Sequence, residues 1–582
     1  MKLILREYLA QLKERDELDA VLPDLLSEKG FHVLSRPQRG TTQHGVDFAA
    51  VSPASDAPRK LYLFSLKRGD LTRQDWNGTP QALRPSLDEI RDVYIPTKVP
   101  RKYAGLEIVI CLCFGGDIQE QVQAAVRLYT AQNTTDRITY EEWNGDRIAE
   151  LMMDGVLREH VLPRPLQASF RKAVALVDEP EVAYRHFSEL VRQLRDAATK
   201  PAERVRAARQ LYICVWVMFV WGRDRDNLEA PYQASELGLL HIWDLIRPTL
   251  GAKTAEQRDL WLVLDQMIRL HWAVANAFID GKIGPHANVR DAIGTAAAGS
   301  SPVDVNLALF DLLGRIAMLG HWSVFAIERD PRLEADARAS LDSYVSMGLA
   351  LIRNNAALRL PITDEQATSI ALFLLLWARS GEQTDDVRPW LNAMTQRLYR
   401  AVHWRRHYPT SKTDYRDLIA HPIDASDAYF QEATVGSTLI PLLALWCRVL
   451  GLTEASEKLG ELASSKLGHC AMQLWSVDDI SDQHLYRNDE LHGRAIMGLP
   501  IDDTDDLLDT LIEAANAHQD FAQLSANRSG LWPVVLTACR HWRLPVPIEF
   551  TLAPMTAGPE TAGEDADVSR DAIGEDVGPR TT

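Results

Sequence analysis

The sequence predicts a chain in two parts, an α/β domain at the N-terminus followed by a large all-helical domain. Before about residue 165, apolar positions at helical spacing alternate with short strand-like runs bounded by Pro, Gly and Asp turn signals. From there to about Trp542, stretches of 12 to 20 residues keep helical spacing with almost no alternation. The prolines of Val161-Leu162-Pro163-Arg164-Pro165 break regular structure between the two parts.

These patterns divide the chain into three predicted segments. Residues 1–160 form the α/β domain, and residues 166–550 form a helical array with several helices that are apolar nearly all round. Residues 551–582 hold seven acids against two arginines and are rich in Pro, Gly, Ala and Thr. Such a tail cannot bury enough apolar surface to offset its ordering entropy, so it is predicted to be disordered.

The elements of the first domain follow from periodicity. Leu18, Val21, Leu22, Leu25 and Leu26 share one face of a helix over 14–29, which Gly30 caps. A polar loop over 52–58 joins two strands as an antiparallel hairpin. The predicted strands are Gly45 to Val51, Leu61 to Lys67, Leu106 to Phe114 and Ile138 to Glu141, and a helix over Asp146 to Met153 closes the domain.

Composition limits the classes of protein to which the chain belongs. At 582 residues and 46% hydrophobic, the chain predicts two to four domains. The longest apolar run, Leu211 to Trp221, falls short of the roughly 20 residues that span a bilayer, so no membrane segment is expected. A charged N-terminus and six scattered cysteines predict a cytoplasmic protein with reduced thiols. The chain has no Gly-x-x-x-x-Gly-Lys-Ser/Thr loop, so no nucleoside triphosphate is expected as a ligand.

The charge is uneven along the chain. A net charge of −17 argues against coating of nucleic acid by bulk attraction. Residues 59–102 nevertheless contain ten Lys/Arg and five acids, a local excess of 10 − 5 = +5. This basic stretch is predicted to surround a candidate site on the hairpin.

The candidate site comes from strand alternation. A period of two places Asp47 on the face of Ala49 and Val51, and Ser65 on the face of Lys67. The antiparallel hairpin then brings Asp47 close to Ser65 and Lys67. On the preceding helix, an acid at the border of the apolar face is expected to point toward this site; the candidates are Asp19, with Glu17 and Glu14 as alternatives.

A helix acid, Gly45-Val46-Asp47 and Ser65-Leu66-Lys67, in this order, resemble the PD-(D/E)xK restriction endonuclease superfamily, in particular its Mrr-like members. The similarity covers about residues 10 to 155. It implies a mixed sheet flanked by helices, with Mg²⁺ (or Mn²⁺) bound by Asp47 and Asp19, or by Glu17 in place of Asp19. Lys67 would orient the attacking water or stabilise developing charge.

Ser65 departs from this pattern, because it stands where the family has a second acid. Mg²⁺ prefers oxygen ligands and keeps several waters, so it tolerates one carboxylate fewer at a cost in affinity. Asp70 and Glu17 are alternative sources of the missing charge. Ser65 would then act through a water molecule. Beyond the site, Arg68, Arg73 and Gln74 lie in a predicted polar loop that would contact the backbone of a DNA duplex.

The resemblance therefore predicts a metal-dependent endonuclease that hydrolyses phosphodiester bonds, most simply in double-stranded DNA. A nuclease domain fused to a helical array suggests, by analogy, a bacterial effector of antiviral defence whose helical domain senses a trigger or a partner protein. The alternative is a catalytically degenerate nuclease fold that binds nucleic acid or a partner as an adaptor, and Ser65 favours it. A helical scaffold with an accessory α/β cap is a third interpretation.

One further motif is ambiguous. His403 and His407 have the i, i+4 spacing that binds a metal on a helix, but the Glu of a His-Glu-x-x-His motif is missing. A solvated or core pair of histidines is the simpler interpretation.

Overall fold

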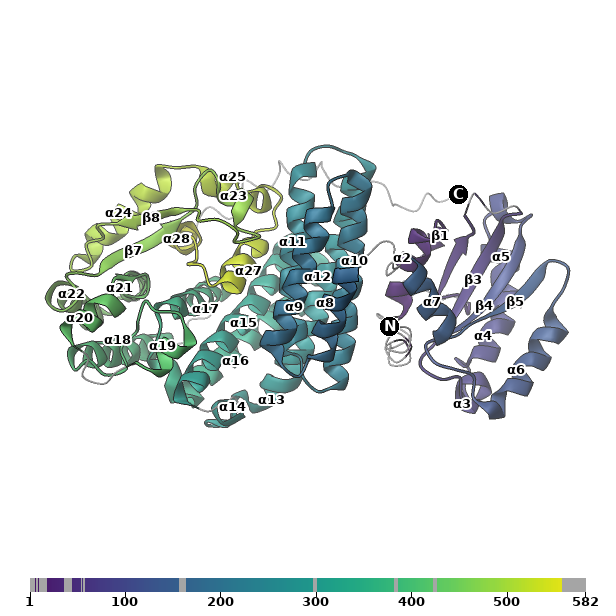
Figure 1. The fold of residues 1–582 in the computed structure, drawn as a ribbon, viewed down its shortest axis with the longest axis horizontal. Helices are drawn as coiled ribbons and strands as arrows, with labels where there is room; N and C mark the ends of the chain where they lie inside the picture. The colour runs from purple at the N-terminus through teal and green to yellow at the C-terminus, as the bar shows by residue number, and fades with distance from the viewer. Residues whose placement is uncertain are drawn as a thin grey trace. The chain divides into compact units, whose positions relative to one another are not determined.

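The computed structural model describes residues 6, 9, 18–35, 44–53, 55, 58–155, 164–296, 301–381, 386–421 and 426–556. It divides the chain into two compact units, Met1–Val274 and Ala275–Thr582. A mixed five-stranded sheet lies near the N-terminus and mostly helices follow (Figure 1), so the predicted order of an α/β part and a helical part is confirmed. None of the described helices is long and apolar enough to cross a membrane.

The first sheet has the strand order β1-β2-β3-β4-β5. β1, β2 and β3 pair as an antiparallel meander, which confirms the predicted hairpin, whereas β4 and β5 join in parallel. Parallel neighbours need crossover connections, and helices provide them here. The strands are β1 His32–Ser35, β2 Phe48–Val51, β3 Lys60–Lys67, β4 Glu107–Phe114 and β5 Ile138–Trp143.

Helices cover both faces of this sheet. One face packs on α3 Arg73–Asn77, α4 Leu83–Glu89 and α6 Glu120–Asn133, through a buried cluster that includes Leu61, Leu63, Ile110 and Leu112. The other face carries Phe48 stacked on Phe64, with ring centroids 4.4 Å apart. α2 Asp19–Glu28 contacts β2 and α7 Gly145–Gly155. Along α2 and the residue before it, the buried side chains Leu18, Leu22, Leu25 and Leu26 are those that the helical spacing predicted.

The segment after β3 is more regular than the sequence suggested. Residues Arg73 and Gln74 lie in the short helix α3 and not in a loop. Thr72 Oγ1 accepts a hydrogen bond from Asp75 N at 3.2 Å, and Asp75 Oδ2 accepts one from Thr72 N at 3.3 Å. This reciprocal capping box satisfies two backbone donors, which is why a run of polar residues forms a helix here. The crossover to β4 continues through a π-helical turn, Ile90–Tyr94, and α5 Ile95–Lys98.

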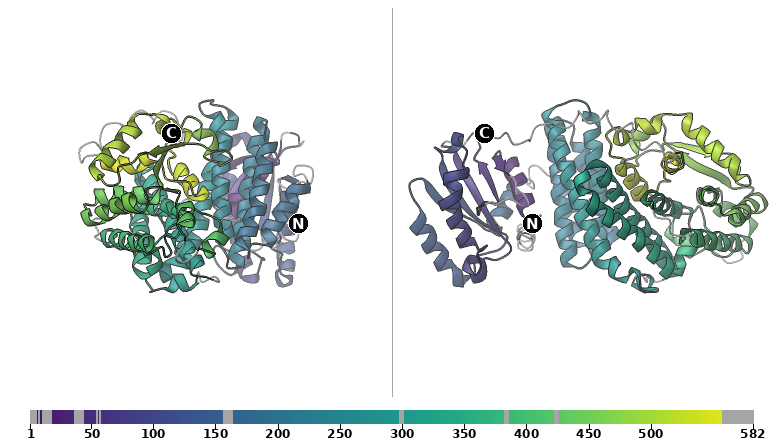
Figure 2. Two further views of the ribbon diagram at one scale, coloured as in Figure 1. Left: turned by 60° about the vertical axis from the view of Figure 1, so that its left-hand side comes forward. Right: turned by 180° about the vertical axis from the view of Figure 1, so that it is seen from behind.

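The remainder of the first unit is helical. Long helices run alongside one another (Figure 2), and most side chains of α11 and of the second half of α10 are buried. The helices are α8 Arg164–Ala175, α9 Pro180–Ala197, α10 Pro201–Asp224, α11 Glu229–Ile246 and α12 Ala255–Phe278, whose last residues belong to the second unit.

The second unit is also built mainly of helices. Its longest helix, α15 Pro302–Arg329, contacts α16, α17 and α27. The helices are α13 Gly284–Ala287, α14 Ala292–Ala296, α15, α16 Glu334–Asn354, α17 Ala367–Ser380, α18 Val387–His403, α19 Tyr415–Ile419, α20 Asp427–Ala433, α21 Leu439–Val449, α22 Thr453–Ser465, α23 Ser481–His484, α24 Thr504–Asn516, α25 Asp520–Gln523, α26 Ser525–Arg528, α27 Pro533–Trp542 and α28 Ile548–Thr556.

The prediction of an all-α second part is wrong in one respect, because this unit contains a three-stranded sheet. The strands are β6 Gly436–Ser437, β7 Ala471–Ser476 and β8 Arg494–Met497, in the order β6-β7-β8. Strands of two to six residues are too short to produce a visible alternation in the sequence.

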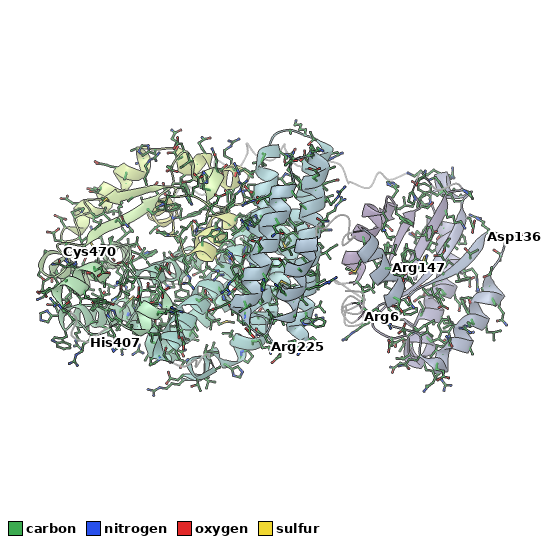
Figure 3. All side chains as sticks on the ribbon, in the orientation of Figure 1. Arg6, Asp136, Arg147, Arg225, His407 and Cys470 are labelled. Atoms are coloured by element: carbon green, nitrogen blue, oxygen red, sulfur yellow. The ribbon has the colours of Figure 1, made fainter. Side chains whose placement is uncertain are left out.

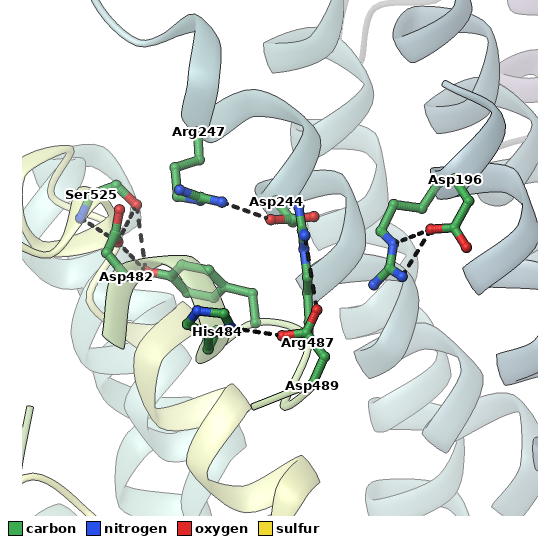
Figure 4. Close-up of polar contacts among 10 residues, drawn as sticks. Asp196, Asp244, Arg247, Asp482, His484, Arg487, Asp489 and Ser525 are labelled. Atoms are coloured by element: carbon green, nitrogen blue, oxygen red, sulfur yellow. Dashed lines mark hydrogen bonds and ion pairs between the residues drawn. The ribbon is translucent and has the colours of Figure 1, made fainter. Parts of the chain in front are cut away.

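A polar cluster fixes the connection between β7 and β8. Asp482 Oδ1 accepts hydrogen bonds from Ser525 N at 2.8 Å, Ser525 Oγ at 2.7 Å and Tyr486 Oη at 3.2 Å (Figure 4). His484 Nδ1 lies 2.9 Å from Asp489 Oδ1 in the same connection. The last described helix, α28, extends to Thr556, so the prediction of disorder is wrong for residues 551–556; the rest of the predicted tail, 557–582, lies outside the described residues.

Candidate active site at the carboxyl end of strand β3

Asp47 is fixed to the end of β3 through its side chain. Its Oδ2 accepts a hydrogen bond from Leu66 N at 2.7 Å, and its own backbone N donates to Phe64 O at 2.9 Å. β2 begins at Phe48, one residue after Asp47. The Leu66 amide lies beyond the ladder between β2 and β3, and it donates to the Asp47 carboxylate instead. A charge-assisted bond of this kind is short and directional, and it holds the carboxylate in one orientation.

Glycine at position 45 is what allows Asp47 this position. Gly45 has φ +78°, a left-handed conformation that side chains disfavour. A Cβ at this residue would lie 2.1 Å from Ser86 O, in the backbone of α4. The turn before Asp47 therefore passes directly against a helix, and the Gly-x-Asp pattern has a steric cause.

The strand alternation predicted for Asp47 is interrupted. Val46 belongs to the same buried cluster as Ala49 and Val51, although strict alternation would place an even-numbered residue on the opposite face. The phase of the side chains therefore changes between residues 46 and 49. The Asp47 side chain contacts β3 at Leu66. A period of two, which would place it on the face of Ala49 and Val51, therefore does not describe its position.

Ser65 and Lys67 follow regular alternation on β3. Leu61 and Leu63 face α3, α4 and α6, so Ser65 and Lys67 project from the same side of the strand. Ser65 is 1% exposed, and its hydroxyl group is thus almost completely removed from solvent. Lys67 is half-buried at the last position of the strand.

Two residues that the sequence did not single out lie near Asp47. Burial raises the pKa of the Cys113 thiol on β4, and the Asp47 carboxylate raises it further. Arg147 of α7 lowers that pKa through its charge, so its guanidinium group also lies close. The side chain of Arg147, labelled in Figure 3, bonds Glu141 Oε2 at 2.7 Å and lies 4.5 Å from the ring centroid of Trp143.

A topological rule would have indicated these residues. β3, β4 and β5 are parallel, so their carboxyl ends meet at one edge of the sheet. Ligands of parallel sheets bind at that edge. Lys67 ends β3, Cys113 lies one residue before the end of β4, and Arg147 follows β5 in the first turn of α7. The sequence pattern does not show that β4 and β5 pair in parallel, so this rule cannot be applied to the sequence alone.

The other predicted ligands have different positions. Asp19 is half-buried in the first turn of α2, and Glu17, like Glu14, lies outside the described residues. Asp70 is committed elsewhere, because its Oδ1 accepts a hydrogen bond from Asp117 N at 2.8 Å. This bond joins the segment after β3 to the one after β4, so Asp70 has a structural role that its place in the sequence did not indicate.

The basic stretch 59–102 divides between the two ends of the sheet. Arg68, Arg73 and Gln74 are exposed and follow the carboxyl end of β3. Lys60 begins β3 and pairs with Glu107 Oε1 at 2.9 Å, and Lys98 to Lys102 precede β4 at that same end. At about 3.3 Å per residue, an eight-residue strand separates its ends by roughly 23 Å. Only part of the basic stretch therefore lies beside the candidate site.

Asp47 is the residue whose chemistry fits a hard cation best. It supplies a carboxylate held by a backbone donor, and Asp19 supplies a second candidate carboxylate on α2. Mg²⁺ binds proteins through one or two carboxylates and takes its remaining ligands from water and phosphate. Among the described residues, no three His, Cys, Asp or Glu side chains gather closely enough to hold a metal ion by themselves.

Comparison with known proteins gives no relative from which to transfer a function. No protein-family model, curated protein or solved structure matches the chain.

Proposed function

We propose that the N-terminal domain is a metal-dependent endonuclease that hydrolyses phosphodiester bonds, most simply in double-stranded DNA. The observation that carries this proposal is the hydrogen bond of 2.7 Å that fixes Asp47 Oδ2 to Leu66 N, one residue before Lys67. The bond fixes a carboxylate beside the carboxyl end of the strand whose last residue is Lys67, and this end of the strand is a suitable place to bind and polarise a phosphodiester.

Each residue has a distinct role in this proposal. Asp47 and Asp19 would hold Mg²⁺, which when bound supplies charge neutralisation and lowers the pKa of a bound water. Lys67 stabilises the negative charge that develops on the phosphate. Arg68, Arg73 and Gln74 are exposed beyond the end of β3 and would position the nucleic-acid backbone. We propose a role in antiviral defence for the whole chain, with the helical part sensing a trigger or a partner protein.

The test is a plasmid-nicking assay with the full chain in Mg²⁺ and in Mn²⁺. Asp47→Asn keeps an oxygen acceptor for Leu66 N but removes the charge, and Lys67→Met keeps the length of the side chain but removes the ammonium group. Each variant should reduce nicking by about a hundredfold or more. Lys60→Met is the matched control, since Lys60 lies at the opposite end of the same strand. Nicking that persists in both site variants would exclude this active site.

A catalytically degenerate domain that binds nucleic acid as an adaptor is the second candidate. Ser65 favours it, because a serine that is 1% exposed stands where the resembled nucleases carry a ligand carboxylate. The same assay separates the two candidates. An adaptor would retard the plasmid in a gel with the wild-type chain and both variants, and it would not nick the plasmid with any of them.

A further inference from the structure

The end of α18 in the second unit is rich in basic residues, and acids of neighbouring elements contact Arg405, Lys412 and the hydroxyl group of Tyr399. Residues 387–413 contain six Lys/Arg and no Asp or Glu, in a chain with a net charge of −17. We call the exposed side chains at the end of this helix the α18 basic surface. It consists of Arg397, Arg400, His403, Trp404, Arg406 and His407, all of which are exposed. Figure 3 labels His407 in this unit.

The helix ends in a Schellman motif with arginine at the position that normally takes glycine. Arg405 N donates to Val402 O at 3.2 Å, and Arg406 N donates to Ala401 O at 2.8 Å. Arg405 has φ +51°, a left-handed conformation that residues with a side chain disfavour. His407 is also left-handed, with φ +49°, so it lies beyond the end of the helix and does not share a helical face with His403.

Contacts with α20 hold Arg405 in this conformation. Its guanidinium group pairs with Asp427 Oδ1 at 2.5 Å and lies 5.0 Å from the ring centroid of Phe430. Arg405 is therefore anchored inward, while its neighbours Trp404 and Arg406 are exposed. Backbone strain supported by surrounding contacts is common where a surface has a binding role.

Aromatic groups accompany the cationic residues of this surface. The indole of Trp404 is 60% exposed and is the one large exposed hydrophobic side chain among residues 387–413. The rings of Tyr399 and His403, which precede Trp404 in the sequence, stack on each other with centroids 5.9 Å apart and planes at 10°. Arg400 and Arg406 take part in no ion pair among the residues that the structure describes.

We propose that the α18 basic surface binds single-stranded nucleic acid. An exposed indole stacks on an unpaired base, and arginines beside it neutralise phosphates, which is the combination that single-strand binders use. A duplex offers no free base face to Trp404. An anionic membrane is disfavoured because interfacial binding requires several exposed apolar side chains, whereas this surface has one. The proposal goes beyond the endonuclease proposal and does not depend on Asp47 or Lys67.

The test measures fluorescence anisotropy of labelled oligonucleotides of about 20 nucleotides with the full chain in EDTA, where metal-dependent cleavage cannot occur. Single-stranded DNA and RNA of one sequence, and the DNA duplex, form the three arms. Trp404→Ala should weaken single-strand binding about tenfold, and Trp404→Phe should recover part of it. Arg400→Gln/Arg406→Gln should weaken binding and reduce the slope of log affinity against log salt by about 0.7 for each phosphate that is no longer neutralised.

The control is Arg258→Gln/Arg338→Gln, which removes two exposed arginines from α12 and α16. It should bind as the wild-type chain does. Equal single-strand affinity in the wild type, Trp404→Ala and the Arg400/Arg406 variant would overturn the proposal. So would binding to vesicles of phosphatidylserine that depends on Trp404 without any binding to oligonucleotides. Because the assay contains EDTA and measures binding alone, its outcome is separate from success or failure of the nuclease proposal.

Discussion

At the scale of the residue, the candidate site depends on how one carboxylate is held. Asp47 accepts from a strand backbone at 2.7 Å, so its orientation is fixed before any ligand arrives. Preorganised groups cost little rearrangement when charge develops. Ser65, on the same strand as Leu66, contributes a small neutral side chain to the interior where a second acid was expected from the resemblance. Substitutions at positions 47 and 65 can therefore separate the contribution of the site to stability from its ability to bind a cation.

The bond from Leu66 N gives Asp47 a role in stability as well. Asp47→Ala removes the acceptor, and the free energy of unfolding of the α/β domain should fall by about 1 to 3 kcal/mol. Asp47→Asn keeps an amide oxygen there and should lose less than half as much. Chemical denaturation measures both values, and hydrogen exchange at the Leu66 amide reports the bond itself. Equal losses in the two variants would contradict a role for the hydrogen bond.

Introducing a carboxylate at position 65 tests whether the site can bind a cation. Without divalent ions, Ser65→Asp places a carboxylate at a position where the serine is 1% exposed, and this buried charge should destabilise the domain by about 3 to 5 kcal/mol. Mg²⁺ or Mn²⁺ should recover most of this loss if the site holds a cation, because the cation neutralises the added charge. Thermal unfolding in EDTA and in millimolar metal measures the difference. Ser65→Asn is the uncharged control, and identical metal dependence in both variants would rule out a cation at this position.

At the scale of the element, the carboxyl edge of the sheet is closed by tight contacts between loops. Asp70 Oδ1 accepts from Asp117 N, and Gly116 has so little space that a Cβ would lie 2.1 Å from Asp70 Oδ1. The segments after β3 and β4 are therefore packed as one piece around the candidate site. Short connections of this kind limit the positions that Lys67 and Arg68 can take.

This packing predicts coupling between Asp70 and Gly116. Asp70→Ala should cost about 1 to 2 kcal/mol in the free energy of unfolding, because the hydrogen bond to Asp117 N is removed. Gly116→Ala should cost more because of the clash. The double variant should be less destabilised than the sum, since removing the Asp70 carboxylate relieves the shortest of the contacts that the added methyl group would make. A double-mutant cycle by denaturation measures the coupling, and strict additivity would refute it. Nicking should survive in Asp70→Ala, since Asp70 is not a proposed metal ligand.

At the scale of the whole molecule, the second unit contains a buried histidine whose protonation is linked to folding. In the second unit, His321 of α15 is 0% exposed, and its Nε2 lies 2.9 Å from Leu372 O, to which it donates. Burial lowers the pKa of His321 to about 3, and the charge of Arg379 contributes to this lowering. The folded unit therefore keeps this histidine neutral at a pH where an unfolded chain would protonate it.

The stability of the second unit should thus depend on pH. Between about pH 6.5 and pH 3 the unfolded chain binds a proton at His321 that the folded chain does not, so the free energy of unfolding falls as the pH falls. From about pH 7 to about pH 5 the loss should be about 2 kcal/mol. His321→Gln keeps a donor to Leu372 O and should remove this part of the pH dependence in urea unfolding. His518→Gln, at an exposed histidine, should leave it unchanged.

The sequence by itself determined the features that depend on local periodicity. The buried face of α2, the hairpin of β2 and β3, and the order of an α/β part before a helical part were all predicted, because spacing along one element decides which side chains it buries. The Gly-x-Asp pattern and the position of Lys67 at the end of a strand were visible for the same reason. The roles of Asp47, Ser65 and Lys67 in catalysis stay predictions.

The tertiary structure decided what depends on pairing between distant segments. The parallel register of β3, β4 and β5 brings Cys113 and Arg147 to the same edge of the sheet as Asp47, and it places Lys98 to Lys102, which precede β4, at the opposite end. Gly45, two residues before Asp47, approaches the backbone of α4 so closely that a Cβ would lie 2.1 Å from Ser86 O, and no local pattern records this contact. The sheet β6-β7-β8 also depends on contacts between distant segments. Its three short strands form only when residues far apart in the chain pair with one another.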